Sequence, residues 1–472
     1  MRFDLQAAEA VMSGRGPYDV VIVGAGAAGI TLARQLAAAG KRVALMEGGG
    51  YDYSDASQAV YRGEVLGDPY FPLESARQRF LGGTTNHWVG WSRGFEPVDF
   101  DRGALGPEYS WPIAFADLDP YLAPACRILS VPNAFEDRPV PQSSIRRIDF
   151  QFSPPVRFRD AFVAELDASE QIDLVLNANL VGLAGEGGRV RTASFENYDG
   201  KRAEVSGDTF IFAMGGIENS RFLLWFEQQY GGAFFSTGLP IGQYWMEHPH
   251  FTLGQAIVDK QKVTERFYAV NPDKQKTLSI LNCGFRVDYF DDVGTKALIR
   301  DALCTVAPTL GKKLMGMAGK NLVCGARFRA AWEQAPTASN RVALGSDVDR
   351  FGVPRTALHW QKTALDRKTV TASVMAFSDW LLEADAGRIQ LADWMLREGD
   401  YPEHDELAGY HHMGGTRMHA SPAYGVVDAD CKVFGSDNLY VAGSSLFTTG
   451  GHNNPTLPLV QFALRLADHL AA

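Results

Sequence analysis

The chain contains, at residues 18–48, the stretch YDVVIVGAGAAGITLARQLAAAGKRVALMEG. Within it, the run Val20 to Val23 has the length and β-branched content of a buried parallel strand. Three glycines follow that run, at Gly24, Gly26 and Gly29, and Ala- and Leu-rich sequence comes next. The stretch therefore predicts a strand, a tight turn and a helix, in that order.

Each glycine has its own role in such a unit. Gly24 permits the turn that leaves the strand, and Gly29 lets the helix pack close to that strand. Gly26 lets backbone N–H groups approach a pyrophosphate, and the helix start at Ala27 and Ala28 adds N–H donors and a positive dipole. The turn is therefore typical of a dinucleotide site.

A second strand is predicted over residues 42–46, and it ends in Glu47 followed by Gly48. Glu47 lies 23 residues after Gly24, close to the roughly 20 expected for the acid that binds a ribose hydroxyl. A carboxylate at this place favours an adenosine ribose with a free 2′-hydroxyl, as in FAD or NAD, over NADP.

The composition excludes several classes of protein. With 472 residues the chain exceeds a single hydrophobic core, so two or three lobes are expected. The net charge of −10 disfavours nucleic acid as a partner, because a phosphate backbone requires a clustered basic face. No stretch approaches roughly 20 consecutive apolar residues, so no membrane span is expected.

The five cysteines are scattered, and no CxxC pair occurs. Zinc or iron–sulfur ligation is therefore poorly supported, and isolated buried thiols in a reducing compartment are the better interpretation. The N-terminal residues contain neither an apolar signal core nor a twin arginine. We expect a cytoplasmic protein.

Other elements follow from local patterns in the first half of the chain. Residues 1–16 are expected to form a short polar helix and residues 49–75 a long surface loop with short helices. Asp117 is expected to cap a helix with Pro120 in its first turn. Residues 171–195 read as two strands joined by a Gly-Glu-Gly-Gly turn.

Further along, residues 207–220 predict a buried strand that ends in Ala-Met-Gly-Gly, with a helix over residues 217–228. Residues 252–400 alternate β-like runs, such as 277–287, with helical stretches, such as 371–386. This region indicates a separate lobe that covers the substrate.

Near the C-terminus, residues 438–442 predict a strand that returns to the first sheet. Asn454 and Pro455 are typical of the N-cap and first position of the last helix. His248 and His250 flank a proline and could ligate a metal, but no third ligand is evident nearby. A polar loop near a domain junction is the favoured interpretation, and no metal site is predicted.

Residues 79–91 read RFLGGTTNHWVGW. Adjacent glycines and threonines suit a tight loop with exposed backbone donors. Two interpretations stay open for this stretch, which are a loop that faces a ligand and a turn that leads into an aromatic core segment.

Taken together, these pieces resemble the glucose–methanol–choline (GMC) flavoprotein oxidoreductases. The motifs that carry the resemblance occur in the family's order and cover both ends of the chain: VGAGAAG (23–29) with Glu47, LGGTTNHW (81–88), AMGGIENS (213–220), IGQYWMEHPH (241–250), HHMGGTRM (411–418), GVVD (425–428), NLYVAGSSLF (438–447) and HNNPT (452–456). Residues 255–400 carry no motif of the family. The threonine-rich loop and the Asn-Pro ending look closest to the sugar-oxidising branch, such as pyranose oxidases and glycoside 3-oxidases or dehydrogenases.

The resemblance implies an α/β fold. It implies a Rossmann-like FAD-binding domain, similar to that of p-hydroxybenzoate hydroxylase, with an α+β substrate domain built on an antiparallel sheet. We expect the FAD-binding domain to be discontinuous. Its expected segments are 16–100, 160–235 and 405–472, and the substrate domain takes 101–159 and 236–404.

The resemblance also implies the chemistry, which is hydride transfer from an alcohol carbon to flavin N5 while a histidine base removes the hydroxyl proton. The base of the family precedes Gly-Thr by three residues, which selects His412, and His411 becomes a supporting residue. The partner of the base comes just before the last helix, and the following proline selects Asn454, with Asn453 and His452 as alternatives. An imidazole titrates near neutrality, and an amide can donate a hydrogen bond to a developing alkoxide.

The cofactor implied is FAD. The residues expected to bind it are Gly24, Gly26, Ala27, Ala28, Gly29, Glu47, Gly48, Arg79, Gly82, Gly83, Thr84, Thr85, Asn86, His87, Val181, Ala213, Gly215, Asn219, Gly443, Ser444, Asn454, Pro455 and Thr456. Some sugar oxidases of the family attach FAD to a histidine in a Thr-His-Trp sequence, and here the tripeptide is Asn86-His87-Trp88. A covalent histidyl link through His87 and a non-covalent contact are both open.

The expected substrate is a small alcohol, sugar or glycoside, and the electron acceptor is O2 or another acceptor. A dehydrogenase that uses a quinone or protein acceptor and a lyase that keeps FAD without redox turnover are the alternatives. The sequence leaves the oligomeric state open.

Overall fold

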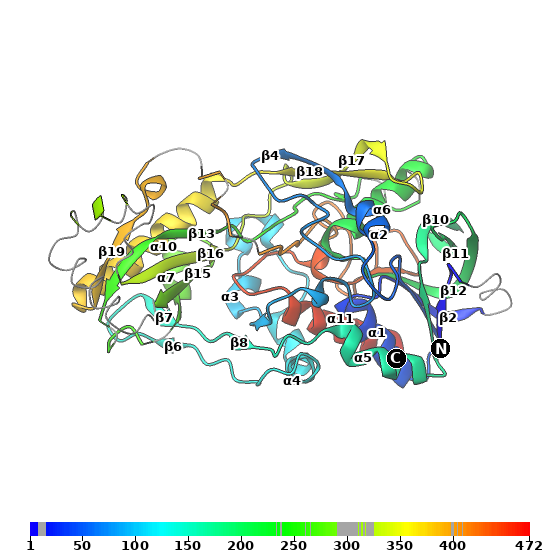
Figure 1. The fold of residues 1–472 in the computed structure, drawn as a ribbon, viewed down its shortest axis with the longest axis horizontal. Helices are drawn as coiled ribbons and strands as arrows, with labels where there is room; N and C mark the ends of the chain where they lie inside the picture. The colour runs from blue at the N-terminus through cyan, green and yellow to red at the C-terminus, as the bar shows by residue number, and fades with distance from the viewer. Residues whose placement is uncertain are drawn as a thin grey trace.

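The structure is a computed structural model. It describes residues 1–7, 16–232, 234–236, 238–259, 261–264, 266–289, 310, 313–314, 317, 325–397, 401–403, 405–407 and 409–472. Figure 1 shows an elongated molecule with a different sheet at each end. The chain termini lie beside one sheet, and the second sheet lies at the opposite end with the long helix α10 (Ala364–Glu383).

The sheet beside the termini has eight strands in the order β1-β9-β3-β2-β12-β11-β10, with β20 paired to β12. Its strands are β1 (Arg2–Asp4), β2 (Tyr18–Val23), β3 (Val43–Met46), β9 (Ile172–Leu176), β10 (Asn179–Glu186), β11 (Arg189–Glu196), β12 (Arg202–Phe212) and β20 (Leu439–Val441). The strands from β1 to β12 in this order are parallel, and the pairs formed by β10, β11 and β12 are antiparallel. The predicted hairpin of β10 and β11 is confirmed.

Strand β12 joins the two halves of this sheet. Its first part pairs with β11, and its last residues pair in parallel with β2 on one side and β20 on the other. Phe210 lies opposite Val21 and Leu439, so three segments far apart in the chain end at one edge. The predicted return of residues 438–442 to the first sheet is therefore confirmed.

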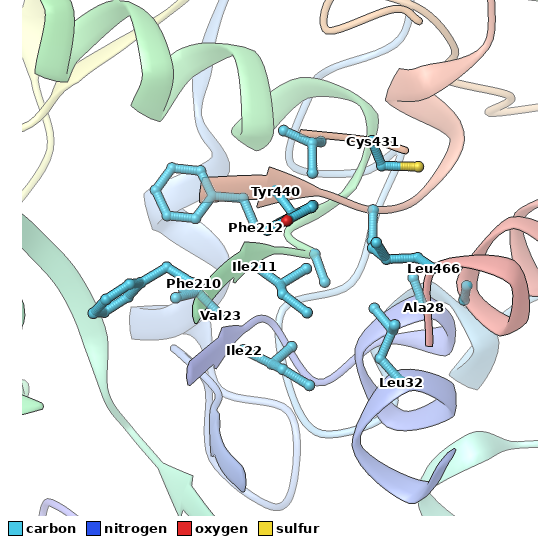
Figure 2. Close-up of a cluster of buried hydrophobic side chains, with 14 of the residues drawn as sticks. Ile22, Val23, Ala28, Leu32, Phe210, Ile211, Phe212, Cys431, Tyr440 and Leu466 are labelled. Atoms are coloured by element: carbon cyan, nitrogen blue, oxygen red, sulfur yellow. The ribbon is translucent and has the colours of Figure 1, made fainter. Parts of the chain in front are cut away.

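Helices α1 (Ala27–Ala38) and α11 (Thr456–Ala471) cover one face of this sheet. Figure 2 shows Ile22 and Ile211, from neighbouring strands, pointing toward Leu32 of α1 and Leu466 of α11. All four side chains are buried, because the parallel strands are apolar on both faces and need a cover on each. Helix α6 (Gly215–Gln229) follows β12 directly, as the sequence predicts.

The second sheet is antiparallel, with the order β19-β13-β16-β15-β14-β7-β6. Its strands are β6 (Arg138–Pro139), β7 (Ile145–Arg147), β13 (His250–Val258), β14 (Phe267–Val270), β15 (Cys283–Tyr289), β16 (Ala326–Trp332) and β19 (Gly387–Leu391). Phe285 and Phe328 pack against Phe377 of α10, with ring centroids 5.1 Å from it. The predicted α/β class with an added antiparallel sheet is thus confirmed.

Smaller elements connect the two sheets. They are strands β4 (Gly63–Gly67), β17 (Arg341–Val348), β18 (Pro354–Trp360), β5 (Trp91–Ser92) and β8 (Gln151–Phe152), and helices α2 (Asp55–Gln58), α3 (Pro97–Phe100), α4 (Asp119–Ile128), α5 (Phe158–Ala168) and α7 (Pro272–Leu278). Short 3-10 turns cover Ala59–Tyr61, Gly83–Asn86, Gly103–Leu105, Pro107–Tyr109, Phe115–Leu118, Asp393–Met395 and Ser444–Leu446.

Several local predictions were wrong. Residues 2–4 form a strand beside β9, because a short chain end gains hydrogen bonds from an open sheet edge, and residues 8–15 lie outside the described part. Residues 63–67, within the predicted loop, form β4, which pairs with β18 from far along the chain. The stretch 277–287 begins inside α7 and becomes strand only at residue 283.

Two predicted helix caps also differ. Asp117 caps a 3-10 turn, since its carboxylate accepts the N–H of Ala114 at 2.8 Å, and α4 begins later, at Asp119. The last helix begins at Thr456, and no side chain caps it. The side chain of Asn454 is therefore not used as a helix cap.

Among the described residues, no helix is both long and apolar enough to cross a membrane. Cys126, Cys283 and Cys431 are buried and unpaired, as expected for structural thiols, whereas Cys304 and Cys324 lie outside the described residues.

Candidate active site

A cavity of 560 Å³ extends from the carboxyl edge of the eight-stranded sheet to the antiparallel sheet. The predicted residues that line it are Gly24, Gly26, Ala27, Ala28, Glu47, Gly83, Thr84, Thr85, His87, Ala213, Gly215, His412, Gly443, Ser444, Asn454, Pro455 and Thr456. Segments from the start, middle and end of the chain therefore meet around one space.

The glycine turn after β2 has the geometry that its sequence predicts. Gly24 has φ +104°, and a Cβ on Gly29 would lie 1.9 Å from the carbonyl oxygen of Gly24. A Cβ on Gly26 would meet no atom within 4 Å, so this glycine faces the open cavity. The fold itself therefore requires glycine at positions 24 and 29, whereas glycine at position 26 leaves room for a ligand.

Glu47 is buried at the end of β3, and backbone amides hold both of its oxygens. Oε2 accepts the N–H of Ala25 at 2.9 Å, and Oε1 accepts the N–H of Gly49 at 2.8 Å. These contacts fix the carboxylate beside the glycine turn and leave lone pairs for a hydroxyl donor from the cavity.

The loop after residue 79 is a tight turn, as predicted. Gly82 and Gly83 have φ of +91° and +56°, and the hydroxyl of Thr85 donates to the carbonyl of Gly82 at 2.6 Å. The amide of Asn86 donates to the carbonyl of Leu81 at 2.8 Å. Asn86 therefore shapes the turn rather than lining the cavity, while His87 is exposed at the cavity wall.

Some predicted cofactor residues lie outside the cavity lining. They are Gly29, Gly48, Arg79, Gly82, Asn86, Val181 and Asn219. Arg79 donates to the hydroxyl of Tyr198 at 2.9 Å, and its guanidinium lies against Gly48. Asn219 donates to the carbonyl of Ala442 at 3.0 Å and so ties α6 to the end of β20.

His412 is buried between aromatic rings. Its Nε2 lies 3.0 Å from the hydroxyl of Tyr70, which donates to Glu247 at 2.5 Å. The ring of Trp245 lies 5.7 Å from the His412 ring between centroids. Burial lowers the pKa of His412 to about 3 and raises the pKa of Glu247 to about 7.

His411 forms a second chain of hydrogen bonds. Nε2 of His248 lies 3.2 Å from the carbonyl oxygen of Gly450, which can only accept, so this nitrogen carries a proton. Burial lowers the pKa of His248 to about 4, so the ring is neutral and its Nδ1 accepts. Nδ1 of His411, 2.8 Å away, must therefore donate.

The tautomer of His411 follows from this chain. Burial holds the pKa of His411 well below its usual range, so the ring is neutral. With a proton on Nδ1, its Nε2 carries a lone pair, and no group in the described part of the chain donates to that nitrogen. His411 lines the cavity and is only partly buried, so the lone pair is available to a ligand.

The segment before α11 completes this part of the cavity. Asn454 lines it, and no described group bonds its amide. Asn453 is buried without lining the cavity, and His452 lies 3.3 Å from the carboxylate of Glu96. Asn454 and His452 both line the cavity, but His452 is buried and paired with Glu96, whereas Asn454 is only partly buried and pairs with no described group.

Other residues of the cavity wall were missed. They include Tyr61, Arg77, Trp88, Trp91, Phe150, Met214, His250, Phe267, Gly284, Arg286, Ala331 and Tyr410, whereas His411 and His452, which also line the cavity, were named from the sequence in secondary roles. Alternation along strands β13 to β16 predicts which of their residues face the cavity, but only after the pairing of these strands in the sheet is known. The described residues contain no group of three or more metal-ligating side chains, and His248 serves His411 instead.

Comparisons with known proteins agree with this arrangement. Residues 336–463 match the sequence profile described as GMC oxidoreductase, and residues 19–217 match that described as FAD dependent oxidoreductase. The chain is a GMC-type FAD-dependent oxidoreductase. The prediction of this family from the motifs is confirmed.

Individual proteins similar to this oxidoreductase include two relatives and a solved structure. A 2-methyl-1,2-propanediol dehydrogenase from Mycolicibacterium austroafricanum is 22% identical over 96% of this chain and 95% of its own. A C-glycoside 3-oxidase from Microbacterium trichothecenolyticum is 32% identical over 28% of this chain and 25% of its own. An FAD-dependent oxidoreductase from Chaetomium thermophilum shares the fold, with a TM-score of 0.60 and 15% identity over 96% and 98% of the two chains.

The residues of the glycine turn fit FAD. The open space over Gly26 and the N-terminus of α1 suit a diphosphate, and the lone pairs of Glu47 suit a ribose hydroxyl. Thr84 and His87, on the exposed face of the loop after residue 79, line the same cavity.

Glu47→Gln should weaken FAD binding by about 10- to 100-fold, because a carboxamide turns one donor toward a backbone N–H and loses a charged acceptor. Titration of apoprotein with FAD, followed by flavin fluorescence, measures the effect. Glu64→Gln, on exposed β4, is the matched control and should leave the affinity unchanged. Equal affinities of the wild-type and Glu47→Gln proteins would contradict the role of this carboxylate.

Proposed function

We propose that the protein oxidises an alcohol or sugar hydroxyl to a carbonyl, with a neutral histidine removing the hydroxyl proton. The observation that carries the proposal is the hydrogen-bond chain that leaves a lone pair on Nε2 of His411 in the cavity of the glycine turn. The activities for which two relatives are named, diol dehydrogenase and C-glycoside 3-oxidase, support this substrate class.

When bound, FAD supplies the two-electron acceptor for the hydride that leaves the alcohol carbon. The residues proposed to hold it are the glycine turn, Glu47, the loop at Thr84 and His87, and the segment at Asn454 to Thr456. The N-terminal end of α11, which carries a partial positive charge, favours electron-rich groups beside it.

Two histidines compete for the role of base. The family spacing selects His412, whose ring is almost fully buried and whose Nε2 is bonded to Tyr70. Because Tyr70 donates to Glu247, Nε2 of His412 carries the proton and Nδ1 keeps a lone pair. The outer nitrogen of His411 is unbonded, and a proton on the inner nitrogen holds the useful tautomer. We favour His411 as the base because its ring is the less buried of the two in the cavity, and we give His412 a supporting role.

Asn454 is proposed as the partner of the base. Its free amide can donate a hydrogen bond to the oxygen on which negative charge develops as the proton leaves. Proton removal by His411 and stabilisation by Asn454 would then act on the same hydroxyl.

Several finer points remain part of the proposal. The acceptor is O2 or another acceptor, and peroxide formation in air separates the two. The two-domain division, with the FAD-binding part over 16–100, 160–235 and 405–472, is consistent with the two sheets. A cytoplasmic location rests on composition and on the unpaired thiols.

His411→Ala should retain FAD and slow the reductive half-reaction by roughly 10²–10⁴-fold, which is typical of a lost general base. His412→Ala, the matched neighbour, should slow it far less, because that ring acts through Tyr70. Anaerobic stopped-flow bleaching of the flavin by an oxidisable sugar or alcohol measures both. The reverse ranking would return the role of base to His412.

In a Glu247→Gln background, which removes a carboxyl group whose pKa burial raises to about 7, the rate of flavin reduction should be constant between about pH 8 and about pH 6. The pKa of His248 is lowered from 6.5 to about 4, and that of His411 is lowered well below 6.5, so both rings stay neutral over this range. Protonation should slow the reaction only at lower pH. A fall in rate with a midpoint near 6.5 would contradict the buried, neutral chain.

If His87 forms the proposed covalent link, acid precipitation should carry the yellow chromophore down with the protein. His87→Ala should then release it to the supernatant while FAD still binds, because the glycine turn and Glu47 are unchanged. Complete release of flavin from the wild-type protein would rule out the link and leave a non-covalent contact.

A further inference from the structure

The antiparallel sheet turns a charged face toward the cavity. On β15, Phe285 and Val287 are buried under α10, while Gly284 and Arg286 lie on the opposite face and line the cavity. The same alternation on β16 places Arg329 on the cavity side. Arginine pairs with arginine across these strands, since Arg286 lies opposite Arg329.

One carboxylate serves three guanidinium groups on this face. Asp288 lies 2.6 Å from Arg286, 3.2 Å from Arg266 and 3.4 Å from Arg329. We call these four residues the arginine cluster. In the part of the chain that the structure describes, no other carboxylate contacts its three arginines, so the cluster carries a net charge of about +2.

The cluster is partly removed from water. The side chains of Arg329 and Arg286 are 18% and 26% exposed, and Nε of Arg329 is buried without a hydrogen-bond partner. Burial lowers the pKa of Arg329. Asp288 opposes this shift, and the nearby positive charges of Arg327, Arg286 and Arg266 add to it. His250 also faces the cavity, and burial lowers its pKa to about 4, so its ring is neutral at pH 7 and leaves the charge of the cluster unchanged. Uncompensated cations in such a place cost free energy that a bound anion would offset.

The arginines lie close to the proposed reactive end. A Cβ on Gly284 would lie 3.8 Å from the ring of His452, two residues before Asn454. Arg286 is two residues further along β15, which is about 7 Å in a strand. The backbone of Arg286 is therefore on the order of one sugar ring away from the part of β15 that faces His452.

Aromatic rings form the walls of the cavity beside Arg286. Trp91, Phe150 and Phe267 line the cavity, and the guanidinium of Arg286 lies 5.8 Å from the ring centroid of Trp91. Such walls pack against the apolar face of a pyranose, and Arg286 is held at one end of them.

Resting on the proposed function, we propose that the substrate is an anionic sugar whose carboxylate or phosphate binds Arg286 and the arginine cluster while its hydroxyl faces His411. A guanidinium binds either oxyanion through parallel hydrogen bonds, so the structure specifies the anionic group rather than its source. The anion neutralises a charge that Asp288 leaves uncompensated.

The test uses the holoenzyme and pairs of sugars that differ only in charge. Methyl β-D-glucuronide is compared with methyl β-D-glucoside, and D-glucose 6-phosphate with D-glucose, by anaerobic flavin bleaching. The anionic member of at least one pair should have an apparent Kd about 10- to 100-fold lower, and the pair that shows it identifies the anion. Equal Kd values within both pairs would overturn the proposal.

Variants of the cluster should shift this preference in opposite directions. Arg286→Gln should raise the Kd for the anionic sugar about 10-fold and raise that for the neutral sugar far less. Asp288→Asn should lower the Kd for the anion, because the net charge rises. Arg202→Gln, on an exposed strand of the other sheet, is the control. If Arg286→Gln raised the Kd for the anionic and the neutral sugar by the same factor, the residue would be structural and the proposal would be overturned.

Two further measurements keep the outcomes separate. If Arg286→Gln does not fold, Arg266→Gln, whose side chain is 51% exposed, replaces it. Binding of D-glucuronate is also followed by the flavin difference spectrum without turnover. Binding that is lost on substitution, without any bleaching, supports the anion site and contradicts the proposed function. Bleaching without any preference for the anionic sugar supports the proposed function and contradicts the anion site.

Discussion

The site depends on backbone pairing at the carboxyl edge of the eight-stranded sheet. The N–H of Gly24 bonds to Met46, that of Ala213 to Val23 and that of Ala442 to Phe212, each within 2.8 Å. These bonds hold the ends of β3, β2, β12 and β20 level, so the turns that follow them open on one side. Ligands of doubly wound sheets bind at this edge because the turns and helix N-termini converge there.

A second backbone pairing determines the positions of His248 and His411. Met246 and Met413 exchange backbone hydrogen bonds of 2.8 and 3.0 Å, which fixes the register of two distant segments. His248 thus comes to lie opposite His411. Gly414, with φ +72°, allows this approach, because a Cβ there would lie 2.1 Å from the carbonyl of Tyr244. The tautomer of one ring is therefore a consequence of strand-like pairing between loops.

Burial explains why such a chain of neutral rings is stable. Charged imidazoles would lose hydration in this interior, so the pKa values of His248 and His411 are lowered rather than raised. The arginine cluster is the opposite case, because a guanidinium cannot discharge at neutral pH and must find an anion. The cavity thus has a neutral end and a cationic end.

The sequence by itself determined the nucleotide turn, the acid at Glu47 and the family, since glycine spacing and local periodicity express constraints between near neighbours. Asn454, which the Asn-Pro motif selects, lines the cavity. The sequence did not give β4, the strand at residues 2–4 or the arginine cluster, because each depends on partners far along the chain. Between His411 and His412, adjacent and identical in type, only the tertiary structure decided which outer nitrogen is bonded. The physical reason is that a histidine's hydrogen-bond direction is set by what packs against it, here Gly450 and Tyr70, and not by its place in a motif.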